Sequence, residues 1–150
     1  MIFMKKKVEV NVTGIHNRQG EPEEKINTVS EGVYEVTSDG TGIIEYKEVQ
    51  EADGHRFVFH NKAIISPDKK MLEVQRGGSM STGLVFSEGK DHETEYNTPY
   101  GKMFMNVITK SLAFEEGDVG EIKAVAEYAI KMGDEIVSDS VITIETKKRK

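Results

Sequence analysis

Apolar and polar residues alternate along most of this chain, which is typical of β-strands that bury one face. Residues 7–12 read Lys-Val-Glu-Val-Asn-Val, and residues 72–76 read Leu-Glu-Val-Gln-Arg. Turn signals separate such segments, mostly every ten to fifteen positions: Ser38-Asp39-Gly40, Asp53-Gly54, Ser66-Pro67-Asp68, Gly77-Gly78, Glu88-Gly89, Pro99-Tyr100-Gly101, Glu116-Gly117-Asp118 and Gly133-Asp134. This spacing predicts a meander of antiparallel strands.

Two segments have features that simple alternation does not settle. Residues 119–132 contain good helix formers, with apolar residues that could form a helical stripe, but Ile122 to Ile130 also alternate with charged residues. Because Gly-Asp turns bound this segment and strand patterns flank it, we predict a strand. Gly32 lies inside a long strand pattern from Lys25 to Ser38, where we expect it to bend the strand.

These strands predict one all-β domain that spans residues 1–150. A sheet of many short antiparallel strands must close on itself or fold into two layers, because its exposed edges would otherwise invite aggregation. Almost all connections are short, which favours an up-and-down antiparallel barrel of about eight to ten strands. The length of 150 residues is usual for one domain with a single core.

Composition and charge restrict the function. The net charge of −6 argues against broad electrostatic binding to nucleic acid. The absence of cysteine excludes disulfides, thiol catalysis and thiolate metal sites. The first residues lack the pattern of a secretory signal, and no stretch has the roughly 18 apolar residues of a membrane helix. We therefore expect a cytoplasmic protein that binds neither nucleic acid nor membrane.

The stretch Tyr96-Asn97-Thr98-Pro99-Tyr100-Gly101 predicts a sharp turn between two strands. Proline fixes its own φ and restricts the residue before it to extended geometry, while Gly101 adopts conformations that other residues resist. The following strand pattern, from Lys102 to Phe114, leaves its inner face open. Either of two apolar sets could be buried: Met103, Met105, Val107 and Thr109, or Phe104, Ile108 and Leu112.

The chain resembles a known family through a set of short motifs. These are Tyr46-x-Glu48, Arg76-x-Gly78, Tyr96-x-Thr98-Pro99-Tyr100-Gly101, Thr109 and Tyr128. Together they resemble the YwiB-like family of small bacterial proteins, from the strand at Val8 to the strand at residues 142–144. The resemblance implies a lipocalin-like (calycin-type) β-barrel. It implies no activity, since that family is described as a domain of unknown function.

Several polar residues fall on the apolar faces of the predicted strands. They are Tyr46, Glu48, Arg76, Thr94, Tyr96, Thr98 and Tyr128. An unpaired buried charge costs several kcal/mol, so an inward arginine needs an acidic partner, a bound anion or a path to water. In one interpretation Glu48 and Arg76 pair near one end of the barrel. In the other, Arg76 and the tyrosines bind the carboxylate or phosphate of a small amphipathic ligand in the barrel interior.

Catalysis has little support in the sequence. No histidine has clear metal-ligand spacing, and we expect all four at the surface: His16, His55, His60 and His92. No Gly-x-Ser-x-Gly motif is present. We therefore predict a non-enzyme without metal or cofactor that binds a small apolar or anionic ligand. The alternative is a structural or interaction barrel with a filled interior, whose outer apolar face forms a homodimer. An internal pocket of at least roughly 300 Å³ at Arg76 would favour the ligand binder.

Overall fold

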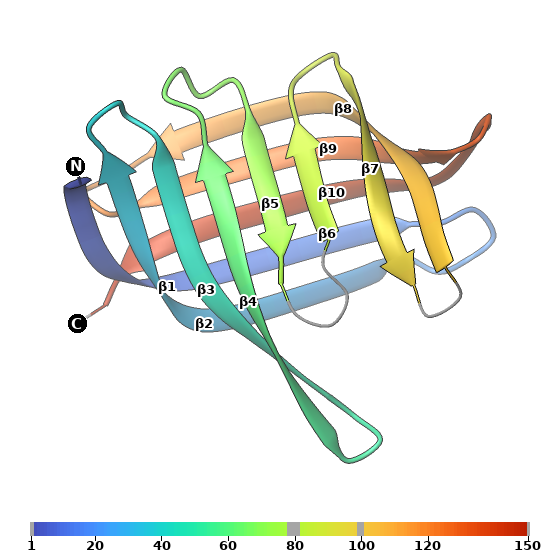
Figure 1. The fold of residues 1–150 in the computed structure, drawn as a ribbon, viewed down its shortest axis with the longest axis horizontal. Coiled ribbons are helices and arrows are strands. Elements are labelled where there is room, and N and C mark those ends of the chain that lie inside the picture. The colour runs from blue at the N-terminus through green and yellow to red at the C-terminus, as the bar shows by residue number, and fades with distance from the viewer. Residues whose placement is uncertain (1, 78–81, 99–100, 150) are drawn as a thin grey trace.

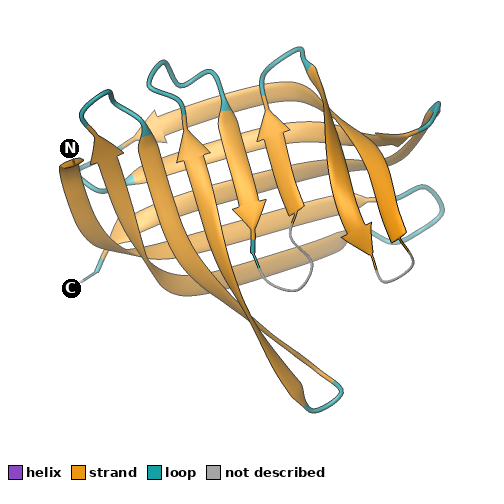
Figure 2. Cartoon of the chain, in the orientation of Figure 1, coloured by secondary structure: helices purple, strands orange, loops and turns teal. Residues whose placement is uncertain are grey.

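In the computed structural model, the described residues are 2–77, 82–98 and 101–149, and all their regular elements are β-strands (Figures 1 and 2). Ten strands lie in this part of the chain: β1 Ile2–Asn17, β2 Glu24–Thr37, β3 Gly42–Ala52, β4 His55–Ile65, β5 Leu72–Arg76, β6 Thr82–Phe86, β7 Asp91–Thr98, β8 Gly101–Glu116, β9 Ile122–Met132 and β10 Glu135–Lys148. None of the described residues belongs to a helix that is long and apolar enough to cross a membrane.

The strands form a single antiparallel sheet in the order β6-β5-β4-β3-β2-β1-β10-β9-β8-β7. Most neighbours in the sheet are also neighbours in the sequence, and β1 pairs with β10 to bring the two ends of the chain together. The outermost strands, β6 and β7, approach each other, and the Thr94 hydroxyl donates a hydrogen bond to the carbonyl of Gly83. The sheet therefore curls into a nearly closed up-and-down barrel, as the turn spacing predicts (Figure 1).

Side chains fill the barrel interior. The large residues that are less than 2 % exposed come from strands all around the sheet: Val8, Val10, Ile44, Leu72, Phe86, Val107 and Ile144. The rings of Phe86 and Tyr128 meet with their centres 4.8 Å apart. The sequence segment that could have formed a helix is strand β9, and its inward Ala124 and Ala126 are at most 1 % exposed.

Strand β8 buries part of each apolar set that the sequence left open, whereas Met103 and Phe104 near its start are 40 % and 56 % exposed. Its pairing register with β9 shifts between Thr109 and Ser111, which marks a β-bulge. Before the bulge Val107 and Thr109 are buried, and after it Leu112 and Phe114 pack against the core. An extra residue in one strand reverses which side chains face inward, so both alternating sets are partly correct.

Strand β2 separates from β3 at Gly32. β2 pairs with β1 from Glu24 to its last residue, Thr37, but its ladder with β3 starts only at Gly32 opposite Tyr46. A Cβ atom on Gly32 would lie 2.7 Å from Cγ2 of Val10 and inside 3.0 Å of the Glu45 carbonyl oxygen. Only glycine therefore fits this close approach. Beyond it, β3 and β4 continue as a hairpin that projects from the barrel (Figure 1).

Candidate functional site

The predicted polar residues Tyr46, Glu48 and Arg76 come together where the hairpin leaves the barrel. Tyr46 lies opposite Asn61 in the β3–β4 ladder, and Asn61 lies opposite Arg76 in the β4–β5 ladder. Glu48 pairs with Phe59 two residues further along the hairpin. These five residues are called the Arg76 cluster below. They meet because three adjacent antiparallel strands align their inward positions in rows across the sheet.

An ion pair lies at the centre of the Arg76 cluster. The Arg76 Nε lies 3.3 Å from Glu48 Oε1, and Arg76 Nη2 donates a hydrogen bond to Glu48 Oε2 over 3.3 Å. Asn61 Nδ2 donates to Glu48 Oε1 at 3.1 Å. The Arg76 guanidinium also lies 4.2 Å from the centre of the Phe59 ring, in cation–π geometry. The inward arginine is therefore neutralised by Glu48, as one interpretation of the sequence predicts.

Two polar atoms of the Arg76 cluster are buried without a hydrogen-bond partner among the described residues. They are the Oδ1 acceptor of Asn61 and the Nε donor of Arg76, which contacts Glu48 Oε1 as an ion pair at 3.3 Å without the geometry of a hydrogen bond. A buried polar atom without a partner costs about 1–3 kcal/mol. The Arg76 side chain as a whole is 39 % exposed, so its other nitrogen atoms reach solvent. The cluster thus offers the exposed part of the Arg76 guanidinium and the Asn61 acceptor to a small polar group.

The cluster raises the pKa of the Tyr46 phenol to about 12. Burial is the main cause, and the negative charge of Glu48 adds to it, while Asn61 and the positive charge of Arg76 act in the opposite direction. Tyr46 therefore stays protonated at neutral pH. Its protonated hydroxyl can donate a hydrogen bond in this part of the barrel.

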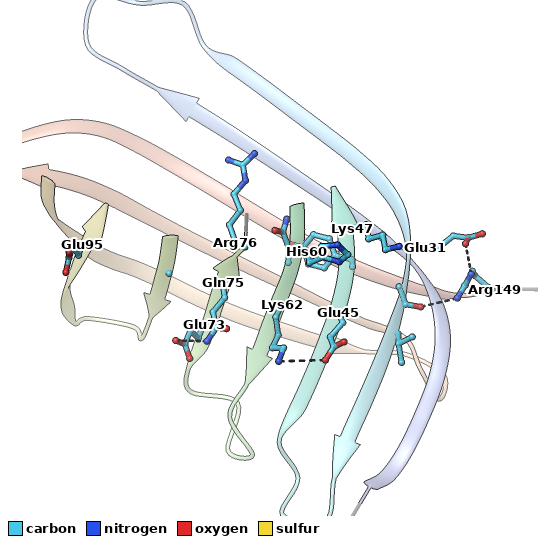
Figure 3. A pocket seen from close by; sticks show the side chains of 16 residues that line it. Glu31, Glu45, Lys47, His60, Lys62, Glu73, Gln75, Arg76, Glu95 and Arg149 are labelled. Carbon is cyan, nitrogen blue, oxygen red and sulfur yellow. Dashed lines mark hydrogen bonds and ion pairs between the residues drawn. The ribbon is translucent and has the colours of Figure 1, made fainter. Parts of the chain in front are cut away.

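A cleft of about 930 Å³ adjoins the Arg76 cluster. Most of its charged side chains lie on the outer face of the sheet, because they alternate with buried residues along β3, β4 and β5. Figure 3 shows this lining and two of its ion pairs. Lys62 Nζ lies 3.8 Å from Glu45 Oε1, and Arg149 Nη1 lies 3.0 Å from Glu31 Oε2. The cleft also reaches Tyr46, Asn61 and Arg76 themselves. Its lining is polar and carries both signs of charge.

The other residues predicted for the site do not join this cluster. Tyr128 is 4 % exposed and contacts Phe86 in the core, and burial raises the pKa of its phenol. The backbones of Tyr96 and Thr98 belong to β7, opposite Met103 and Gly101. The side chains of Tyr96 and Thr98, and all of Pro99 and Tyr100, lie outside the described residues. Gly101 begins β8 with a φ of 125°, a conformation that favours glycine.

The sequence reasoning overlooked two groups with polar contacts. Asn61 continues the inward alternation of Phe59 and Ala63, and that pattern could have identified it. His16 likewise continues the inward row of β1, and its Nδ1 lies 2.8 Å from the hydroxyl oxygen of Ser140. The expected surface position is therefore wrong for His16, which is half-buried. Burial is the main reason that the His16 pKa is lowered, with Arg18 adding to it.

The remaining three histidines differ in burial. His55 and His60 are exposed, as the sequence predicts. His92 is half-buried, so the expected surface position is wrong for it as well, and its Nε2 has no hydrogen-bond partner among the described residues. Within the described ranges, His, Asp and Glu side chains nowhere gather in a group of three or more that could bind a metal ion.

This fold and this cluster define a class: a small antiparallel barrel with a filled core and a paired arginine at one end. Residues 10–144 match the family described as "Domain of unknown function (DUF1934)", and the chain belongs to that family. No curated protein matches the chain. The crystal structure of the ywiB protein from Bacillus subtilis has a TM-score of 0.80 and 17 % sequence identity, and the match covers 99 % of this chain and 96 % of that one. The likeness shows a shared fold, and the resemblance to the YwiB-like family is confirmed.

Proposed function

We propose that this protein is a non-catalytic binding barrel whose Arg76 cluster takes a small ligand with an anionic head and an apolar body. The observation that carries this proposal is the partly exposed Arg76 guanidinium beside Asn61, whose Oδ1 acceptor is buried without a hydrogen-bond partner among the described residues. An anionic head would accept hydrogen bonds from Arg76, and a hydroxyl group of the ligand would donate to Asn61 Oδ1. Leaving the Asn61 oxygen without a donor costs stability.

The surroundings of Arg76 support an amphipathic ligand. Phe57 is 45 % exposed and lies two residues from Phe59, on the same face of β4 as the ring beneath the guanidinium. An apolar body could lie against Phe57 while its anionic head contacts the exposed nitrogen atoms of Arg76. Because Glu48 already neutralises part of this charge, we expect modest affinity. The core fills the barrel interior, so this ligand would bind at the end of the barrel and in the adjoining cleft.

The experiment is a binding screen by calorimetry or native mass spectrometry against fatty acids and other apolar anions. We expect the wild type to bind at least one of them, and Arg76→Ala to weaken that binding about tenfold or more, as expected for the loss of a charged hydrogen bond. Arg56→Ala is the matched control, because Arg56 is an exposed arginine on the neighbouring strand β4. Either no binding to the folded wild type or equal binding by wild type and Arg76→Ala would refute the proposal.

A second candidate function is a structural or protein-interaction barrel. The filled interior favours it, since the buried residues from Val8 on β1 to Phe86 on β6 form one contiguous core cluster. In this case a water molecule would occupy the position between Arg76 and Asn61, and no small ligand would compete for it. The absence of catalysis and the cytoplasmic location both stay predictions. Failure of the ligand screen together with self-association in solution would favour this second candidate.

A further inference from the structure

The projecting hairpin leaves one edge of β3 without a neighbouring strand. The ladder between β2 and β3 covers Gly42 to Tyr46 of β3, whereas the ladder between β3 and β4 continues to Ala52. Among the described residues, no strand pairs with residues 47–52 on the side away from β4. An edge of this kind can add a further strand through backbone hydrogen bonds.

The direction of the backbone groups on this edge follows from the ladder. Thr37 N donates to the carbonyl of Thr41 at the turn between β2 and β3. Hydrogen-bonded pairs alternate in an antiparallel ladder, so the odd-numbered residues of β3 turn their N–H and C=O groups toward the β2 side. Beyond the end of that ladder, the backbone groups of Lys47, Val49 and Glu51 therefore point away from β4.

The side chains on this edge are complementary to a second copy of the same edge. In an antiparallel pair with a two-fold axis at Val49, Lys47 lies opposite the partner's Glu51, and Glu51 lies opposite the partner's Lys47. Val49 then meets the partner's Val49. Val49 and Val58, which pair within the hairpin, are 45 % and 42 % exposed and would form one apolar stripe across four strands. Opposite charges directly across a pair of strands stabilise it.

The other free edge of the hairpin lacks this complementarity. The β4 ladder with β5 begins at Asn61, and Gly77 N donates to the carbonyl of His60, so the even-numbered residues of β4 point their backbone groups away from β3. An antiparallel pair of two β4 edges around Val58 would place Arg56 opposite the partner's His60. Arg56 would then face an imidazole and not a carboxylate, so that pairing lacks the ion pairs available to the β3 edge.

We propose that two copies of this protein associate through the β3 edge at residues 47–51, forming a four-stranded antiparallel sheet in the order β4-β3-β3-β4. The pairing is isologous and closes after two subunits, so it also covers an edge that could otherwise lead to aggregation. Only three residue pairs of this ladder are hydrogen-bonded, so we expect a weak dimer that depends on protein concentration. The inference does not depend on the ligand proposed above.

An engineered cysteine tests the position of the two-fold axis, because the natural chain has no cysteine. In the proposed dimer the Cα atoms of Val49 and the partner's Val49 lie about 5.5 Å apart, within disulfide range. We expect Val49→Cys to form a covalent dimer under mild oxidation. Val58→Cys is the matched control, since it lies on the same hairpin with similar exposure. The two Val58 positions would be about 14 Å apart across the four strands, too far for a disulfide.

Charge exchange supplies an independent test that leaves the barrel core untouched. Sedimentation equilibrium should show that Lys47→Glu raises the dimer dissociation constant on the order of tenfold, because two attractive pairs become repulsive. The double variant Lys47→Glu with Glu51→Lys should restore dimerisation. The proposal is overturned if the wild type sediments as a monomer and Val49→Cys does not cross-link, if Val58→Cys cross-links equally fast, or if the double variant behaves like the single one. Loss of ligand binding in Arg76→Ala would leave all these results unchanged.

Discussion

Gly32 is the position where one added methyl group should disturb the barrel most clearly. In Gly32→Ala, the new Cβ would lie 2.7 Å from Cγ2 of Val10 and inside 3.0 Å of the Glu45 carbonyl oxygen. Tyr46 Cβ would lie 3.2 Å away. The carbonyl belongs to the backbone of the paired strand β3 and cannot turn aside. The substitution therefore forces β2 and β3 apart at the position where their ladder begins.

The expected cost combines two opposing contributions. Overpacking a closely packed interior typically costs about 1–3 kcal/mol, and a clash with backbone belongs at the upper end of that range. Replacing glycine by alanine within a strand contributes roughly 0.5–1 kcal/mol in the other direction. We therefore expect Gly32→Ala to lower the free energy of unfolding by about 2 kcal/mol. In a domain of this size, that corresponds to a fall in Tm of roughly 4–8 °C.

The assay is urea unfolding followed by circular dichroism, with Gly83→Ala as the matched control. Gly83 also lies within a strand, but a Cβ added there meets no atom within 4 Å. We expect Gly83→Ala to leave stability unchanged or to increase it slightly. An unchanged unfolding midpoint for Gly32→Ala, or an equal loss in both variants, would refute the argument that close approach at Gly32 shapes the barrel.

Three further predictions concern the ion pair, the tyrosine and the core. The ion pair of Glu48 and Arg76 is partly exposed, so a double-mutant cycle with alanine at both positions should give a coupling energy of about 1 kcal/mol. A coupling energy near zero would show that solvent screens the attraction between the two charges completely. Because the Tyr46 pKa is raised to about 12 from 10.0, the folded state retains the phenol proton more strongly than the unfolded chain. The free energy of unfolding should therefore fall as pH rises from 10 to 12, by about 2–3 kcal/mol for this group, and urea titrations of Tyr46→Phe should show a smaller decline. Phe86→Ala should lower the free energy of unfolding by about 3–5 kcal/mol, because Phe86 is fully buried, whereas the control Phe104→Ala, at 56 % exposure, should change it little.

The sequence predicted the strands well because their local pattern and their environment agree. One face of each strand meets the core, so a period of two in hydrophobicity marks both the strand and its inner face. This also explains why residues 119–132 form strand β9 despite good helix formers. Its inward positions are alanine, isoleucine and tyrosine, which fill the space beside neighbouring strands. The turn residues then fix where each strand ends.

The inner face of β8 shows where a periodic pattern stops being informative. Both of its alternating sets are apolar, and nothing local marks the bulge between Thr109 and Ser111. The bulge depends on how β8 pairs with β9, which is a long-range contact. In the same way, the inward position of His16 follows from the row that begins at Val8, but its contact with Ser140 needs the pairing of β1 with β10.

The sequence by itself determined that this chain forms an antiparallel barrel and that Arg76 needs a partner, because alternation and the cost of a buried charge are local properties. Only the tertiary structure decided that Glu48 is this partner, that Asn61 and Phe59 join it, and that Tyr128 lies elsewhere in the core. These contacts depend on strand register, which aligns residues far apart in the sequence. The free edge of β3 has the same origin, since it begins where the ladder between β2 and β3 ends, at Gly32 and Tyr46.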